Sequence, residues 1–144
     1  MLVRAERELL APREDVWSFV AEPYHLSDWW PGVAGVEPDR HGLAAGARWR
    51  IRAGTRPGGG PLNAFVRKPE ATGLLLVLDV QPSRLVRLRF VDERLDAELR
   101  LDAVSPERTR AELSVEGSWL RVSRSLPRRA LARLHDLVQT AATL

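Results

Sequence analysis

Cysteine is absent from the 144-residue chain, which excludes disulfides, thiolate nucleophiles and cysteine-ligated metals. Long apolar runs are also missing. The longest uninterrupted aliphatic stretch, Leu74 to Leu78, is far shorter than the roughly 20 residues that a membrane-spanning helix needs. The charged N-terminal segment lacks the apolar stretch of a signal peptide. We therefore expect a cytoplasmic protein without stable membrane insertion.

Lysine is nearly absent as well, because Lys68 is its one occurrence among 22 basic residues. The net charge of +3 is too small to imply a nucleic-acid partner by itself. Arg48, Arg50 and Arg52 share one face of a predicted strand, but neighbouring predicted strands present Asp and Glu on the same side. Cross-strand ion pairs account for both signs of charge. We expect no nucleic-acid partner.

Motifs for nucleotide binding and nucleophilic catalysis are missing too. The chain has no Gly-x-Ser-x-Gly, no His-Glu-x-x-His, no P-loop and no Gly-x-Gly-x-x-Gly. The glycines at 58–60 precede Pro61 instead of a helix start, so they are a poor phosphate cradle. His25, His41 and His135 have no metal-ligand spacing. We expect neither a metal nor a cofactor.

Periodicity predicts the order of the elements. A strand is expected over residues 2–9, because its apolar residues Val3, Ala5 and Leu9 all occupy odd positions and would lie on one face of an extended chain. Pro12 and the acidic residues after it favour a short helix over about 12–21. A second short helical stretch is expected from Pro23 through Trp29, ended by Pro31-Gly32.

From Val33 to Trp119 apolar and polar residues alternate, which is typical of antiparallel strands with one wet and one dry face. The last twenty residues change to helical spacing, with Ser125 as a plausible N-cap. This order predicts one α+β domain over residues 1–144, with a curved antiparallel sheet covered largely by a long C-terminal helix. A twisted sheet and one helix cannot touch along their whole length, so a pocket between them is expected.

Several segments resemble START-like proteins, the SRPBCC superfamily of polyketide cyclase/dehydrase and lipid-transport proteins. They are Ala11-Pro12 with Val16-Trp17, His25-Leu26-Ser27-Asp28-Trp29-Trp30-Pro31-Gly32-Val33, Val80 to Val86, Thr109 and Leu126-Pro127-Arg128-Arg129. The resemblance covers essentially the whole chain. It implies a helix-grip fold: about seven antiparallel strands wrapped around the C-terminal helix, two short helices between the first and second strands, and a hydrophobic cavity. This fold hosts carriers, receptors, cyclases and chaperone cofactors alike.

Aromatic residues are the first candidates for lining such a cavity, because an indole can stack on a flat apolar ligand. By parity Trp49, Phe90 and Trp119 face the dry side of the sheet. The full candidate ligand-binding set is Tyr24, His25, Trp30, Trp49, Phe65, Phe90 and Trp119. Simple core packing is the alternative for the aromatic residues, and surface placement is the alternative for His25.

Two ionisable residues are candidates for catalysis. Strict alternation puts Arg7 on the inner face of the first strand, where a guanidinium could hold a ligand carboxylate or carbonyl. His135 lies between core positions of the last helix and could act as an acid or base. The alternatives are an arginine that reaches out to solvent and a histidine on the boundary of the helix.

Two functions remain open. One is non-catalytic binding of a hydrophobic small molecule, such as a lipid or an aromatic polyketide, by a monomer or homodimer. The other is a cyclase/dehydrase-type enzyme that folds a poly-β-keto chain in the same cavity. A chaperone-cofactor-like domain would need an exposed apolar patch, which the pattern does not show.

Overall fold

The alternating segments and the helical segments form separate elements in the computed structural model, which describes residues 1–53, 72–119 and 122–142. The strands in these residues are β1 (Leu2–Leu9), β2 (Val33–Glu37), β3 (Arg48–Ala53), β4 (Thr72–Gln81), β5 (Leu85–Phe90), β6 (Leu95–Ser105) and β7 (Arg108–Glu116). The helices are α1 (Arg13–Ala21), a 3₁₀ turn at Pro23–His25, α2 (Leu26–Trp29) and α3 (Leu126–Ala142).

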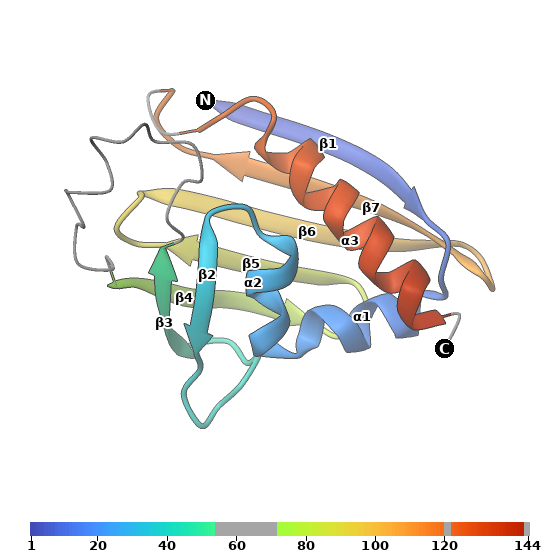
Figure 1. Cartoon of the computed structure of the whole chain (residues 1–144), viewed down its shortest axis with the longest axis horizontal. Coiled ribbons are helices and arrows are strands. Elements are labelled where there is room, and N and C mark those ends of the chain that lie inside the picture. The colour runs from blue at the N-terminus through green and yellow to red at the C-terminus, as the bar shows by residue number, and fades with distance from the viewer. Residues whose placement is uncertain (54–71, 120–121, 143–144) are drawn as a thin grey trace, which may run out of the picture.

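The strands pair antiparallel in one sheet, in the order β1-β7-β6-β5-β4-β3-β2. The sheet is curved, and α3 lies across its concave face (Figure 1). α3 packs on β1 and β7, α1 packs on β6 and β7, and α2 packs on β2. The predicted helix-grip architecture is confirmed, including the two short helices between the first two strands. Among the described residues, no helix combines the length and apolar character needed to cross a bilayer.

Alternation along the strands separates the core from the outer face. On β6, Leu95, Leu99 and Leu101 are buried against the helices. Thr109 on β7 is fully buried among apolar neighbours, and its hydroxyl donates to the carbonyl oxygen of Ala11 at 2.8 Å. This bond satisfies the buried hydroxyl and ties the sheet to the chain that enters α1.

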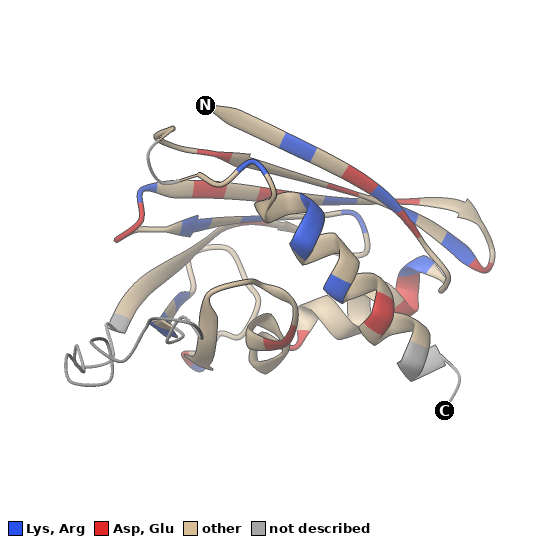
Figure 2. Cartoon of the chain, turned by 45° about the horizontal axis from the view of Figure 1, so that its top comes forward, with Lys and Arg blue, Asp and Glu red and all other residues tan. Residues whose placement is uncertain are grey.

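Charges of both signs are interspersed along the strands (Figure 2). Arg89 on β5 and Asp96 on β6 are direct cross-strand partners, with Nε–Oδ1 and Nη2–Oδ2 distances of 2.8 and 3.1 Å. The hydrogen bonds that Arg89 donates to the Asp96 carboxylate raise the pKa of Arg89 above its ordinary value. The expected cross-strand ion pairing is confirmed at this pair.

One side chain that was expected to face the core does not. Trp119 is 72% exposed, so the parity prediction for it is wrong. β7 ends at Glu116, and the strand alternation that would have turned Trp119 inward ends with it. Phe65 lies outside the described residues.

The connection between β2 and β3 is held by one carboxylate. Asp39 accepts hydrogen bonds from the backbone N–H of His41 and of Arg48, both at 3.0 Å. The Arg48 bond is the main reason that the pKa of Asp39 lies below its ordinary value. The loop also supplies the Gly42 carbonyl that accepts from Nε1 of the buried Trp49 at 3.0 Å.

We predict that Asp39→Asn lowers the free energy of unfolding at neutral pH. Because folding lowers the pKa of Asp39, its contribution is complete above the unfolded value of about 3.9 and is lost as pH falls through the folded value. Urea unfolding between neutral pH and about pH 3 measures this, with the exposed Glu107→Gln as control. A difference between wild type and Asp39→Asn that stays constant over this range would contradict the assignment.

Candidate functional site

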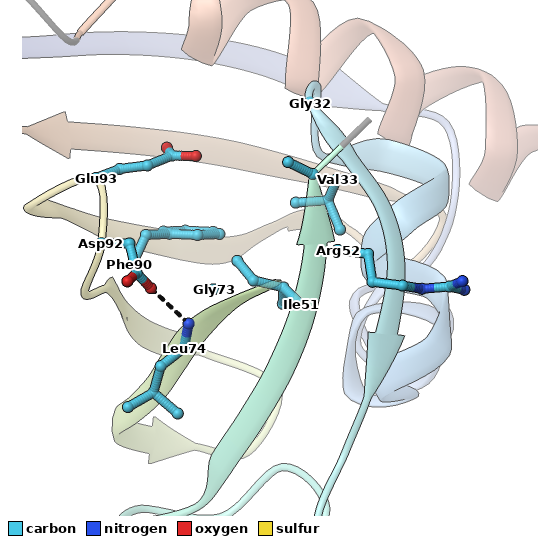
Figure 3. A pocket seen from close by; sticks show the side chains of 10 residues that line it. Gly32, Val33, Ile51, Arg52, Gly73, Leu74, Phe90, Asp92 and Glu93 are labelled. Atoms are coloured by element: carbon cyan, nitrogen blue, oxygen red, sulfur yellow. Dashed lines mark hydrogen bonds between the residues drawn. The ribbon is translucent and has the colours of Figure 1, made fainter. Parts of the chain in front are cut away.

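A hollow of about 280 Å³ opens where β3 ends and β4 begins, beside the end of β5. Its apolar walls are Val33, Ile51 and Phe90, whose side chains converge on one space (Figure 3). The size is near the lower end of small-molecule sites, which begin at roughly 300 Å³. The arrangement can hold a compact apolar group.

The backbone beside this hollow favours glycine at two positions. Gly73 is paired with Ile51 across β3 and β4, so it occupies an inner-face position without a side chain. A Cβ at Gly73 would lie 3.0 Å from Oδ2 of Asp92 and 3.3 Å from Cγ1 of Ile51. Gly32, with φ of +88°, adopts the left-handed turn that carries the chain from α2 into β2.

Phe90 is backed by an aromatic stack. The rings of Trp30 and Phe90 lie 4.8 Å apart at 20°, and Trp29 meets Trp30 edge to face at 5.6 Å. Both tryptophans are only 2% exposed. The floor of the hollow is therefore a rigid aromatic layer that connects it to α2 and the core.

The rim of the hollow carries acidic groups. Oδ2 of Asp92 accepts from the backbone N–H of Leu74 at 2.7 Å, which fixes the turn after β5 over the start of β4. Glu93 lines the same space and is exposed. Arg52 also borders the hollow, but its guanidinium extends away from it over Gly35 of β2 (Figure 3). Among the described residues, the rim therefore carries the carboxylates of Asp92 and Glu93.

The predicted aromatic candidates are distributed over several places. Phe90 lines the hollow and Trp30 stacks behind it, while Trp49 is buried and bonded to the Gly42 carbonyl. Tyr24 is 62% exposed. His25 stacks on Phe19 at 4.1 Å and donates from Nδ1 to the Phe19 carbonyl at 2.8 Å. Of the six candidates that the structure describes, Phe90 lines this hollow and Trp30 lies directly behind it.

The two catalytic candidates lie elsewhere. Arg7 is paired with Ala111, whose side chain is buried, so strand parity does put Arg7 on the inner face, yet it is exposed at the edge strand. His135 is half-buried on α3, and its Nδ1 lies 3.0 Å from Oδ1 of Asp136. Neither is among the described residues that line the hollow.

Asp92 and Glu93 are not among the functional candidates predicted from the sequence, although both line the hollow. Their position at the end of an alternating strand was the available clue. Within the described ranges, no cluster of three His, Asp or Glu side chains is arranged to hold a metal ion.

Comparison with known proteins places the chain among proteins with this architecture. A family model described as polyketide cyclase / dehydrase and lipid transport matches residues 2–139. A search of curated proteins finds no match. The AHSA1-like protein from Aeromonas hydrophila is 13% identical with a TM-score of 0.72, and the alignment covers 99% of this chain and 94% of that one.

Two proteins whose names state biosynthetic roles have the same fold. The di-domain ARO/CYC BexL from the BE-7585A biosynthetic pathway is 15% identical with a TM-score of 0.73, and the alignment covers 100% of this chain and 48% of that one. A norcoclaurine synthase point mutant from Thalictrum flavum is 15% identical with a TM-score of 0.64, at 99% and 96% coverage. At these identities the likeness concerns the fold.

We predict that Asp92→Ala loosens the start of β4. Removing the carboxylate leaves the Leu74 N–H without its acceptor, at a cost of about 0.5–1.5 kcal/mol. The Leu74 amide should then exchange faster with deuterium in NMR spectra. Glu93→Ala is the matched control, since its carboxylate is not the acceptor for Leu74. Unchanged exchange at Leu74 in Asp92→Ala would show that the bond does not hold the strand.

Proposed function

Because the chain belongs to the polyketide cyclase/dehydrase and lipid transport family, we propose that it binds an apolar small molecule in the hollow at the ends of β3, β4 and β5. The observation that carries the proposal is the convergence of Val33, Ile51 and Phe90 on a space that no side chain of Gly73 fills. Apolar walls supply affinity by removing ligand surface from water. Because the Trp30 ring stacks on Phe90 from behind, the Phe90 ring is held as a planar wall, and a planar wall favours a flat ligand.

The rim limits the ligand class. Glu93 places an exposed carboxylate at the mouth, beside the Asp92 carboxylate that holds Leu74, while the guanidinium of Arg52 is turned away. A ligand that carries its own carboxylate there would meet like charge, whereas a hydroxyl would donate to the rim. The ligand that fits is therefore a neutral, ring-containing molecule with a hydroxyl group, such as an aromatic polyketide, more than a fatty acid.

Naphthol and naphthoate test this directly, because they share the same fused rings and differ in the polar group. Titration followed by tryptophan emission should show saturable binding of naphthol, since Trp30 stacks on the wall residue Phe90. Naphthoate should bind at least about tenfold more weakly, the order expected for one unfavourable charge contact at a partly exposed site. Equal binding of the two would overturn the role of the rim, and no binding of either would overturn the binding function.

A substitution that fills the hollow tests whether the ligand binds there. Ala53 is paired with Val33 at the edge of the hollow and is exposed, so Ala53→Phe should occupy the ligand space and lower naphthol affinity by about tenfold or more. Ala103→Phe is the matched control, because Ala103 is an exposed strand residue at the far end of β6. Urea unfolding checks that both variants fold. Wild-type affinity in Ala53→Phe would place the ligand elsewhere.

A second candidate function is a cyclase-type enzyme that uses the same hollow. The observation in its favour is the pair of carboxylates at the rim, because a positioned acid or base can promote aldol closure and loss of water. The solved structures with this fold include a cyclase and a synthase by name, which supports testing for turnover.

If the hollow is catalytic, Glu93→Gln should lower turnover of a poly-β-keto substrate by about 10²–10⁴-fold while naphthol binding remains. Products are followed by mass spectrometry, with Arg7→Leu and His135→Ala measured alongside as the residues that sequence reasoning favoured. Binding without turnover by the wild-type protein would leave the carrier function and remove the enzymatic one.

A further inference from the structure

A second hollow, of about 350 Å³, lies at the other end of β4 and β5. Its lining includes Arg13 from the start of α1, Arg84 from the β4–β5 turn, and Arg100 with Asp102 from β6. In Figure 1 the β4–β5 turn and the start of α1 lie at the same end of the molecule, away from the end of β3. The six residues of β5 span about 16 Å, so the two hollows are separate.

The charge in this second hollow is not balanced. Three guanidiniums and one carboxylate give a local charge of +2. The Asp102 carboxylate is itself 4.0 Å from Nη2 of Arg110, and Arg100 lies 3.7 Å from Oε1 of Glu98 on the exposed face. These are long, solvent-exposed pairs, which neutralise charge only weakly.

Arg13 has an unmet hydrogen-bonding need. Its Nε is buried without a hydrogen-bond partner among the described residues. The Glu14 carboxylate lies 4.0 Å away, beyond hydrogen-bond distance, and its side chain is 71% exposed. Buried donors in folded proteins almost always have an acceptor, so the hydrogen bonding of the Arg13 guanidinium is incomplete, and an oxyanion in the hollow would balance its charge.

Backbone hydrogen bonds hold Arg84 in place. The Arg84 N–H donates to the Gln81 carbonyl at 2.9 Å, and the Arg84 carbonyl accepts from the Leu101 N–H at 2.8 Å. The turn between β4 and β5 is therefore anchored to the β6 segment that carries Arg100. Because the arginines come from three separate parts of the chain, their position around one hollow is a property of the tertiary fold.

We propose that this hollow binds a phosphate group. A phosphate monoester carries about −1.5 to −2 charges near pH 7, which matches the local charge of +2 better than the single charge of a carboxylate does. Guanidinium groups present paired donors that suit the tetrahedral oxygens of phosphate. The bound group sits at the hollow's polar surface and leaves the apolar hollow free.

The probe for the test is inorganic phosphate, titrated at constant ionic strength while backbone amide signals are followed by NMR. Saturable shifts are expected at Arg84, Leu85 and Leu101. Arg84→Gln should weaken binding by about tenfold, the order expected for one charge-assisted hydrogen bond. Arg50→Gln is the matched control, because it removes the same charge from an exposed position on β3.

Titration with acetate in place of phosphate tests whether the hollow prefers phosphate over a carboxylate. The Arg13→Lys variant keeps the positive charge but removes the planar guanidinium donors, so it tests the role of donor geometry. We expect acetate to bind at least about tenfold more weakly and Arg13→Lys to weaken phosphate binding while the fold is retained. Equal affinity for acetate, or equal loss in Arg84→Gln and Arg50→Gln, would overturn the proposal. Shifts spread over all exposed arginines without saturation would overturn it as well.

Discussion

The concave face of the sheet has to be covered, and the available helices cover it unevenly. α3 packs on β1 and β7, α1 on β6 and β7, and α2 on β2. A twisted seven-stranded sheet cannot be matched along its whole width by these helices. The ends of β3, β4 and β5 are where a hollow remains, and the Trp30–Phe90 stack forms the border between it and the packed core. The candidate site follows from this incomplete cover.

The elements could be predicted from the sequence because strand and helix periods differ clearly. Alternation of Leu95, Leu99 and Leu101 with charged residues fixes the inner face of β6, and the structure buries all three. The prediction that alternate residues face the core fails where the strand ends. In the sequence, Trp119 continues the alternation of apolar and polar residues along β7. The strand ends at Glu116, however, and the Trp119 side chain is exposed to solvent. A pattern alone does not show where pairing stops.

The candidate site was less predictable, because it depends on register and on position within the sheet. Gly73 matters because pairing sets it opposite Ile51, and no local signal in the sequence shows that pairing. Arg7 shows the converse case. Its inward parity is correct, yet β1 is an edge strand and the side chain is exposed there. Facing inward and lining a cavity are different properties, and the second requires the tertiary arrangement.

The two hollows differ in a way that bears on whether they can act together. The apolar hollow has carboxylates at its rim, and the hollow at the opposite end of β5 has an excess of guanidiniums. Between them the inner face of β5 is filled by Val86 and Leu88, both buried. Close-packed interiors leave no passage for a ligand, so one molecule cannot occupy both hollows. Any influence of one site on the other has to pass through the packing of β5. Coupling between two sites requires an element with two arrangements, whose equilibrium both ligands shift. Rigid core packing offers no such element, so it favours independent binding at the two hollows.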